Sequence, residues 1–311
     1  QPQKTKFVSL EHGYHGETLG TLAVSDLGLY KKAYEGFGPT THFIKNLPYV
    51  SGIDDPLWRD CESHWQQLIP VLNQIKDTVC AVIVEPIVQG AAGMKCYSAD
   101  FLKRLNSWAQ QHQILVIADE IMTGIGRTGK WLASSHAGIN PDLVCLSKGL
   151  TSGSIPLSCV AIDHDIYELF YHQNKAQDQF LHSHTYSGNP LALAAAVATI
   201  QTIKNERIMD RSDTLGQYML KCVQEISILT GRMSNIRSMG LIVAAELESA
   251  HGCRIGQRIT QEAITLGALL RPIGNTLYWL PPLNIDKKTI GNLAEITLNS
   301  IKRAYKKTTY D

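Results

Sequence analysis

The chain lacks any run of apolar residues long enough to cross a membrane, which would need about 18 in succession. Its longest candidate, residues 190–203, is interrupted by Thr199, Gln201 and Thr202. That stretch predicts a buried helix instead. The first six residues contain no apolar signal region and the chain does not begin with Met, so we expect it to start inside a domain.

Cysteine occurs in no pattern typical of a metal site or a disulfide framework. The seven cysteines are odd in number, never spaced C-x-x-C, and mostly embedded in apolar runs. Such usage indicates reduced thiols in the core of a cytoplasmic protein. His12 and His15 have no convincing further ligand nearby in sequence, so no metal site is predicted.

An excess of charge of either sign is also missing. The 29 basic and 28 acidic residues leave a formal net charge of +1, which argues against nucleic acid as a partner. The one basic cluster, within residues 302–307, is expected to be the solvated end of a C-terminal helix. What the chain does have is 311 residues of which 44% are hydrophobic, enough for a large domain with a smaller one.

The order of apolar runs predicts the fold class. Segments of strand length alternate with longer segments, some of helical period, such as residues 100–111. This alternation is typical of a largely parallel sheet covered on both sides. The predicted strands are residues 7–10, 81–84, 114–118, 143–146 and 157–162.

From about residue 206 the pattern changes. Long helical stretches surround two strand-like segments, residues 241–245 and 276–280, and the chain closes with an amphipathic helix over 289–305. We therefore predict an α/β fold with a large domain over 1–205 and a smaller C-terminal α+β domain over 206–311.

Three of the predicted strands are each followed by an ionisable residue: Glu85, Asp119 and Lys148. Ligands of open α/β sheets bind beyond the carboxyl ends of the strands, so we expect these groups to converge, and burial there favours a neutral lysine amine. Such an amine, with a carboxylate that keeps a pyridine nitrogen protonated, is what pyridoxal phosphate (PLP) requires. The alternative is that Lys148 only ends a strand and Asp119 only caps a helix; the third such strand end favours the cofactor site.

The segment from Gly124 to Lys130 matches two nucleotide-binding patterns, G-x-G-x-x-G and G-x-x-x-x-G-K. Neither fits its context, because Trp131 stands where a P-loop needs Ser or Thr and Asp142 precedes its strand. We predict a glycine-rich turn in which the backbone bends near a cofactor or a partner subunit.

Other segments carry weaker signals. Tyr14, between glycines, can lay its ring against a flat heteroaromatic. The polar loop 182–190 opens a helix and offers hydroxyl and amide donors to a phosphate. Arg271, which follows an apolar segment and precedes Pro272, is either a surface ion-pair residue or a bidentate clamp for a substrate carboxylate.

Together these segments resemble the class III aminotransferases, PLP enzymes of fold type I. Within that class the chain is most similar to members that transfer an amino group from S-adenosylmethionine to 8-amino-7-oxononanoate, giving 7,8-diaminononanoate in biotin biosynthesis. The resemblance covers nearly the whole chain: HGYHG at 12–16, VEPIVQGAAGM at 84–94, IADEIMTGIGRTGK at 117–130, LSKGL at 146–150, HTYSGNP at 184–190 and LLRPIGNTLYWLPPL at 269–283.

The resemblance implies roles for the residues that bind the cofactor. Lys148 would be the Schiff-base lysine and proton shuttle, and Asp119 the partner of the pyridine nitrogen. Tyr14 and Ile121 would pack on opposite faces of the ring. Thr185 would bind the phosphate in the neighbouring subunit, which implies a homodimer with shared active sites.

It also implies substrate-binding roles. Arg271 would receive the carboxylate of the keto substrate, and Glu85 would lie near the cofactor and pair with Arg271 when no carboxylate is bound. Tyr14, Lys148 and Ser183, in the segment before Thr185, would line the substrate site.

Three departures from the family pattern bear on the substrate. Met122 stands where many ω-amino acid members carry Gln, which favours the biotin branch. Ser183 and His184 stand where that branch often has Gly-Pro, a feature shared with general ω-aminotransferases. Family members carry roughly a hundred more N-terminal residues, including a Gly-Ser phosphate cup, so we expect an N-terminal segment to be missing here. An ω-amino acid or amine transaminase, and a non-catalytic dimeric relative, therefore stay open as alternatives.

Overall fold

The computed structural model describes residues 1–26, 28–171, 179–248 and 254–307. A six-stranded sheet forms its larger part, in the order β2-β1-β4-β7-β8-β9, with every neighbouring pair parallel except β8 and β9. The predicted α/β fold with a mostly parallel sheet is therefore confirmed. The strands are β1 (Lys6–Leu10), β2 (Thr41–Ile44), β4 (Val79–Val84), β7 (Leu115–Asp119), β8 (Leu143–Leu146) and β9 (Cys159–Ile162).

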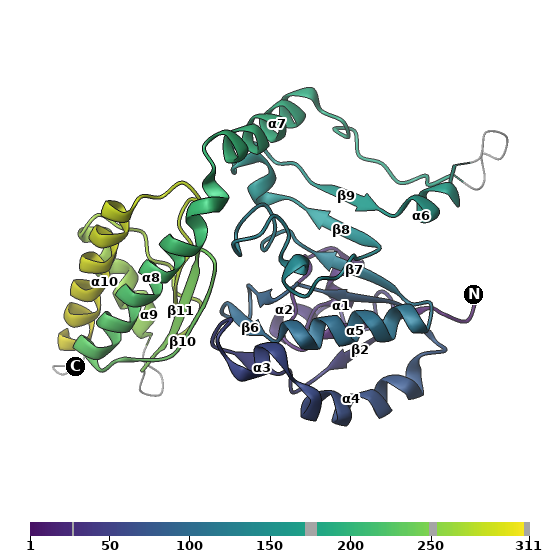
Figure 1. Ribbon diagram of the computed structural model, residues 1–311, viewed down its shortest axis with the longest axis horizontal. Coiled ribbons are helices and arrows are strands. Elements are labelled where there is room, and N and C mark those ends of the chain that lie inside the picture. The colour runs from purple at the N-terminus through teal and green to yellow at the C-terminus, as the bar shows by residue number, and fades with distance from the viewer. Residues whose placement is uncertain (27, 172–178, 249–253, 308–311) are drawn as a thin grey trace.

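Strand β4, in the middle of the sheet, is a continuous apolar run, VCAVIV, and nearly all of its residues are buried. Such runs are typical of parallel strands that are covered on both faces. Two helices, α4 (Glu62–Ile75) and α5 (Ala99–Gln111), lie beside the sheet (Figure 1). Helix α5 begins where the Ser98 side chain accepts a hydrogen bond from Phe101 N at 3.2 Å. Strand β2 was not predicted, because its sequence, THFI, contains no apolar run.

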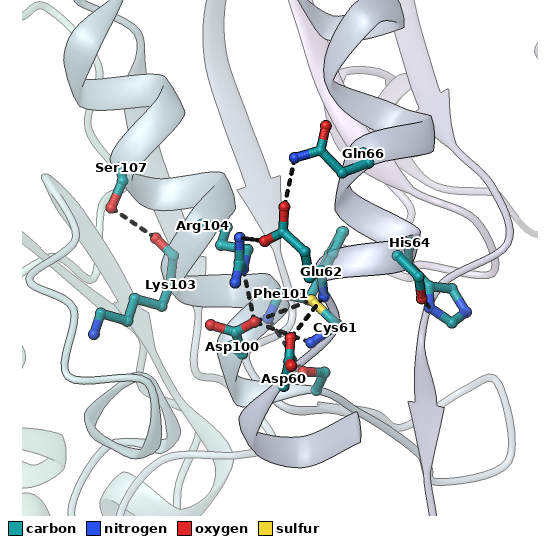
Figure 2. A network of polar contacts seen from close by, with 12 residues as sticks. Asp60, Cys61, Glu62, His64, Gln66, Asp100, Phe101, Lys103, Arg104 and Ser107 are labelled. Atoms are coloured by element: carbon teal, nitrogen blue, oxygen red, sulfur yellow. Dashed lines mark hydrogen bonds and ion pairs between the residues drawn. The ribbon is translucent and has the colours of Figure 1, made fainter. Parts of the chain in front are cut away.

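A polar network joins these two helices (Figure 2). Arg104 on α5 donates through Nε to Asp100 at 2.7 Å and also bonds Glu62 on α4, while Cys61 N donates to Asp100 at 3.0 Å. The ion pairs are partly exposed, so they orient α4 against α5 more than they stabilise the fold.

The smaller part of the molecule is an antiparallel sheet covered by helices, beside the large sheet in Figure 1. Its apolar core is separate from that of the large sheet and draws on residues 215–305. Strand β10 was not predicted, because polar residues such as Ser234 and Arg237 interrupt its apolar residues. The elements are α8 (Ile208–Thr230), β10 (Met233–Met239), β11 (Ile242–Leu247), α9 (Ile255–Thr265), β12 (Thr276–Trp279) and α10 (Lys287–Lys307).

The glycine-rich turn 124–129 contacts this smaller part of the molecule. A Cβ on Gly240, in the β10–β11 turn, would lie 2.3 Å from the backbone carbon of Thr128, so the two turns touch backbone to backbone. Arg127 donates to the carbonyls of Pro281 (2.7 Å) and Leu241 (3.4 Å). Burial lowers the pKa of Arg127 to about 10.

The region around β9 is far more open than predicted. All four residues of β9 are exposed, including Cys159, which the sequence placed in the core. Helix α7 (Pro190–Asn205) was expected to be buried, yet Leu191 is 72% and Val197 54% exposed. One stripe of the helix, Ala192, Ala196, Thr199 and Ile203, is buried against the 3₁₀ helix η2 (Lys148–Thr151) and α8, while apolar side chains on its other side are exposed.

Short elements complete the described chain, and no helix in these ranges is long and apolar enough to cross a membrane. They are α1 (Leu19–Val24), α2 (Leu29–Lys32), β3 (Tyr49–Val50), α3 (Pro56–Arg59), β5 (Val88–Gln89), β6 (Lys95–Tyr97), η1 (Ala133–His136) and α6 (His164–Glu168).

Candidate active site

Four neighbouring parallel strands bring the candidate residues to one edge of the sheet. Glu85 directly follows β4, Asp119 ends β7, and Lys148 lies two residues beyond β8. The loop after β1 adds Tyr14 and His15. Because these strands are adjacent and parallel, their carboxyl ends face the same side, where ligands of open α/β sheets bind.

Asp119 is buried and held from two sides. Its Oδ2 lies 2.8 Å from His15 Nδ1, and its Oδ1 accepts a hydrogen bond from Ile121 N at 3.2 Å. His15 is itself buried, donates through its backbone N to Ser25 Oγ at 2.9 Å, and has Nε2 3.5 Å from Ser9 Oγ. The Asp119 carboxylate is therefore fixed in position before any ligand binds.

The sequence did not reveal this role of His15, which was weighed only as a metal ligand. Its partner Asp119 lies 104 residues further along the chain, so no local spacing signals the contact. Within the described residues, no group of three His, Cys, Asp or Glu side chains is arranged to hold a metal ion.

Glu85 is the second buried carboxylate at this edge. Its Oε2 accepts a hydrogen bond from Tyr14 N at 3.0 Å and its Oε1 one from Gly90 N at 2.9 Å. Burial raises the pKa of Glu85 to about 7, an effect that nearby His15 and the two amides oppose and Asp119 reinforces. Burial therefore disfavours the charged form of this carboxyl group.

Lys148 begins η2 with φ of 38°, in the left-handed region that favours glycine. Contrary to the expected burial, its side chain is exposed, because β8 is only half-buried and β9 is exposed throughout. A cavity of about 820 Å³ opens beside it, lined by η2, α7 and residues 282–284. The lysine amine is thus accessible to a small molecule.

The two residues expected to enclose the cofactor ring lie next to the buried carboxylates. Tyr14 N bonds Glu85, and the Tyr14 hydroxyl donates to Glu17 Oε1 at 3.3 Å. Ile121 N bonds Asp119. Both side chains are half-buried, so both retain surface for a ligand.

The remaining candidates are not brought to this edge within the described chain. Ser183 and Thr185 are exposed on the segment that leads into α7 (Figure 1). Arg271 is exposed on the loop after α9 and has no ion-pair partner among the described residues. The expected Glu85–Arg271 pair is therefore not formed, since both oxygens of Glu85 accept backbone amides instead.

The residues at the edge fit PLP. A buried carboxylate that already accepts one amide and faces His15 suits a protonated pyridine nitrogen, and an accessible amine follows the adjacent strand. Tyr14, Ile121, Asp119 and Lys148 would hold the ring.

Comparison with known proteins agrees with this chemistry. The family model described as aminotransferase class-III matches residues 1–301. The chain belongs to the class III aminotransferase family. Members of this family use PLP, and this aminotransferase has the residues at its sheet edge to bind it.

Curated relatives of this class III aminotransferase include two named adenosylmethionine-8-amino-7-oxononanoate aminotransferase. The Helicobacter pylori protein is 36% identical over 94% of the chain and 67% of its own length. The Synechococcus elongatus protein is 37% identical over 90% of the chain and 65% of its own length. The chain thus spans about two thirds of these relatives.

Solved structures of related enzymes share the fold. An aminotransferase from Bacillus anthracis superposes with a TM-score of 0.88 at 27% identity, covering 97% of this chain and 70% of its own. A PLP-bound amine transaminase from an uncultivated Pseudomonas species gives 0.84 at 30% identity, covering 98% and 70%. The Methanocaldococcus jannaschii enzyme with the same name as the curated relatives gives 0.85 at 27%, covering 97% and 68%.

Proposed function

We propose that this class III aminotransferase transfers the amino group of S-adenosylmethionine to 8-amino-7-oxononanoate, a step of biotin biosynthesis. The proposed substrates are those in the names of two relatives, which are 36% and 37% identical to this chain. The observation that carries the chemistry is the buried Asp119, held by His15, on the strand paired with the one that leads to Lys148.

Each residue at the edge has a distinct task. Bound PLP supplies a ring that accepts the electron pair left when a proton leaves the amine-bearing carbon. Asp119 keeps the pyridine nitrogen protonated, and His15 holds the Asp119 carboxylate toward the ring. Lys148 Nζ anchors the cofactor and then takes and returns the proton of the substrate carbon. Tyr14 and Ile121 pack against the two ring faces.

Substrate recognition extends beyond this edge. Arg271 is the proposed receptor of the keto-substrate carboxylate, because its planar guanidinium binds a carboxylate with two parallel hydrogen bonds. Ser183, on the segment before Thr185, is proposed to line the substrate site. Both are exposed and free of described ion pairs, as groups awaiting a ligand or a second subunit would be.

The proposed assembly is a homodimer with shared active sites. Thr185 would bind the cofactor phosphate of the neighbouring subunit, and its segment is exposed here. Support comes from the uncovered apolar side chains nearby, among them Leu181 at 82% and Leu191 at 72% exposure. We place the enzyme in the cytoplasm, consistent with six described cysteines that are all free thiols.

Visible absorbance of the purified protein with PLP tests this function. A band should form, disappear on addition of S-adenosylmethionine alone, and return with 8-amino-7-oxononanoate. After borohydride reduction, mass spectrometry should find the cofactor on Lys148. Lys130→Ala, which removes an exposed lysine that donates to the Ser135 carbonyl at 3.3 Å, should behave as wild type. A band that survives Lys148→Ala contradicts the assignment.

A second candidate is an amine transaminase. The PLP-bound amine transaminase is 30% identical to this chain over 98% of the chain's length. If simple amines discharge the band and S-adenosylmethionine does not, this second function is correct.

A further inference from the structure

The loop that follows β1 is fixed by hydrogen bonds from consecutive backbone amides. His12 N donates to Asp26 Oδ2 (3.0 Å), Gly13 N to Leu10 O (3.1 Å), and His15 N to Ser25 Oγ (2.9 Å). Tyr14 N, between them, donates to Glu85 Oε2 at 3.0 Å. Of these four acceptors, only Glu85 lies at the end of a different strand of the sheet, directly after β4.

Glu85 also binds the segment that follows its own strand. Its Oε1 accepts the amide of Gly90 at 2.9 Å, and a Cβ on Gly90 would meet that oxygen at 3.7 Å. The side chain is 6% exposed, and no described lysine or arginine forms an ion pair with it. One carboxylate therefore joins the loop after β1 to the segment after β4.

The Tyr14 amide that Glu85 accepts lies beside two groups proposed to serve the cofactor site. Tyr14 provides the proposed ring-stacking side chain, and His15 bonds Asp119 at 2.8 Å. Because Tyr14 and His15 are neighbours, a shift of the Tyr14 amide moves the aromatic ring and the Asp119 partner together.

We infer that Glu85 is a positioning residue whose carboxylate clasps the Tyr14 amide and so places both Tyr14 and His15 for the cofactor. This assignment rests on the proposed function. It differs from an ion pair with Arg271, because pairing would require Glu85 to give up amide hydrogen bonds and leave a buried site for an exposed loop.

Glu85→Gln tests the clasp with little change of shape. A glutamine has one acceptor oxygen and an NH₂ group that cannot accept the second amide, so one of the two bonds is lost. We expect faster hydrogen–deuterium exchange of residues 12–18 without cofactor, and about 10- to 100-fold weaker PLP binding by absorbance titration.

Glu11→Gln is the matched control. Glu11 also accepts a backbone amide, but that of Leu47, at 3.2 Å. It should leave both measurements at wild-type values. If Glu85→Gln and Glu11→Gln give the same exchange rates and the same PLP affinity, Glu85 does not position the loop. Arg271→Ala should leave exchange of residues 12–18 unchanged, and accelerated exchange in that variant would favour the ion pair instead.

Failure of the proposed function has a different signature. If wild-type protein binds no PLP, the function is wrong, while the exchange measurement on cofactor-free protein still decides whether Glu85 holds the loop.

Discussion

The two sides of the sheet edge that carries the site differ in how completely they are built. Around β1, β4 and β7, the buried carboxylates of Glu85 and Asp119 accept hydrogen bonds from backbone amides, and Asp119 also contacts the His15 ring. Around β8, β9 and α7, Lys148 is exposed, β9 is exposed along its length, and apolar side chains face outward. The first region is complete within one chain, whereas the second offers surface for a ligand or a subunit.

The difference separates two kinds of active-site residue. Asp119 and His15 are positioned by contacts inside the described chain, so their geometry is present before the cofactor arrives. Lys148, Thr185 and Arg271 are exposed in the described chain, so a ligand or the proposed second subunit would have to complete their surroundings. Mutations in the two regions should therefore act on different measurable quantities.

Lys148→Ala should have the largest effect on activity and almost none on folding. The exposed amine has little packing to lose, so we expect the free energy of unfolding to change by less than about 0.5 kcal/mol. Turnover should fall by several orders of magnitude, with loss of the cofactor absorbance. Steady-state kinetics and urea unfolding check both parts. A strongly destabilised variant would show that the open region is not open in solution.

Asp119→Asn should affect cofactor chemistry and, more mildly, stability. The amide keeps the shape but not the charge, so PLP binding and turnover should each fall by at least about 100-fold. The free energy of unfolding should fall by about 1–2 kcal/mol relative to wild type, because the contact with His15 weakens. As a control, Asp142→Asn alters a carboxylate that accepts Val116 N at 2.7 Å, and should spare the cofactor spectrum. Identical spectra in both variants would contradict the role of Asp119.

The buried Glu85 should make stability depend on pH. Its pKa is raised from 4.5 to about 7, so its contribution is fully present below pH 4.5 and lost as pH rises through 7. Over that interval it should lower the free energy of unfolding by about 3 kcal/mol. Comparing urea unfolding of wild type and Glu85→Gln from pH 4.5 to 8 isolates this slope. Parallel curves for the two proteins would rule it out.

Substitutions on the outer side of α7 should have the smallest effect on the single chain. Leu191→Gln, at a side chain 72% exposed, should change the free energy of unfolding by less than about 0.5 kcal/mol while weakening self-association. Ala196→Gln, on the buried stripe, should destabilise by about 1–3 kcal/mol. Sedimentation velocity and chemical denaturation together check the pair. Unchanged association of Leu191→Gln would remove this helix from the proposed dimer contact.

The parts of the fold that could be predicted are those whose sequence has a strong apolar pattern. Strands β4, β7 and β8 are continuous apolar runs, and their predicted positions differ from the observed ones by at most two residues. Strands β2 and β10 carry polar residues and were missed, because pairing with neighbours, not their own composition, makes them strands.

The site was predictable to the same degree. Glu85, Asp119 and Lys148 follow predicted strands, so topology alone places them at one edge. The contact of His15 with Asp119 and that of Glu85 with Tyr14 span 104 and 71 residues, beyond any local pattern. The exposure of Lys148 and α7 was mispredicted because an apolar sequence does not show whether other residues of the same chain cover it.

The meeting of the glycine-rich turn with Gly240 restricts how this enzyme can vary. A Cβ at Gly240 would lie 2.3 Å from Thr128 C, and one at Gly216 would lie 2.3 Å from Gly240 O. The first contact joins backbone atoms of the large and the smaller part of the molecule, and the second lies within the smaller part. Any side chain at position 240 would force the smaller part of the molecule away from the glycine-rich turn, so this contact between the two parts requires glycine there.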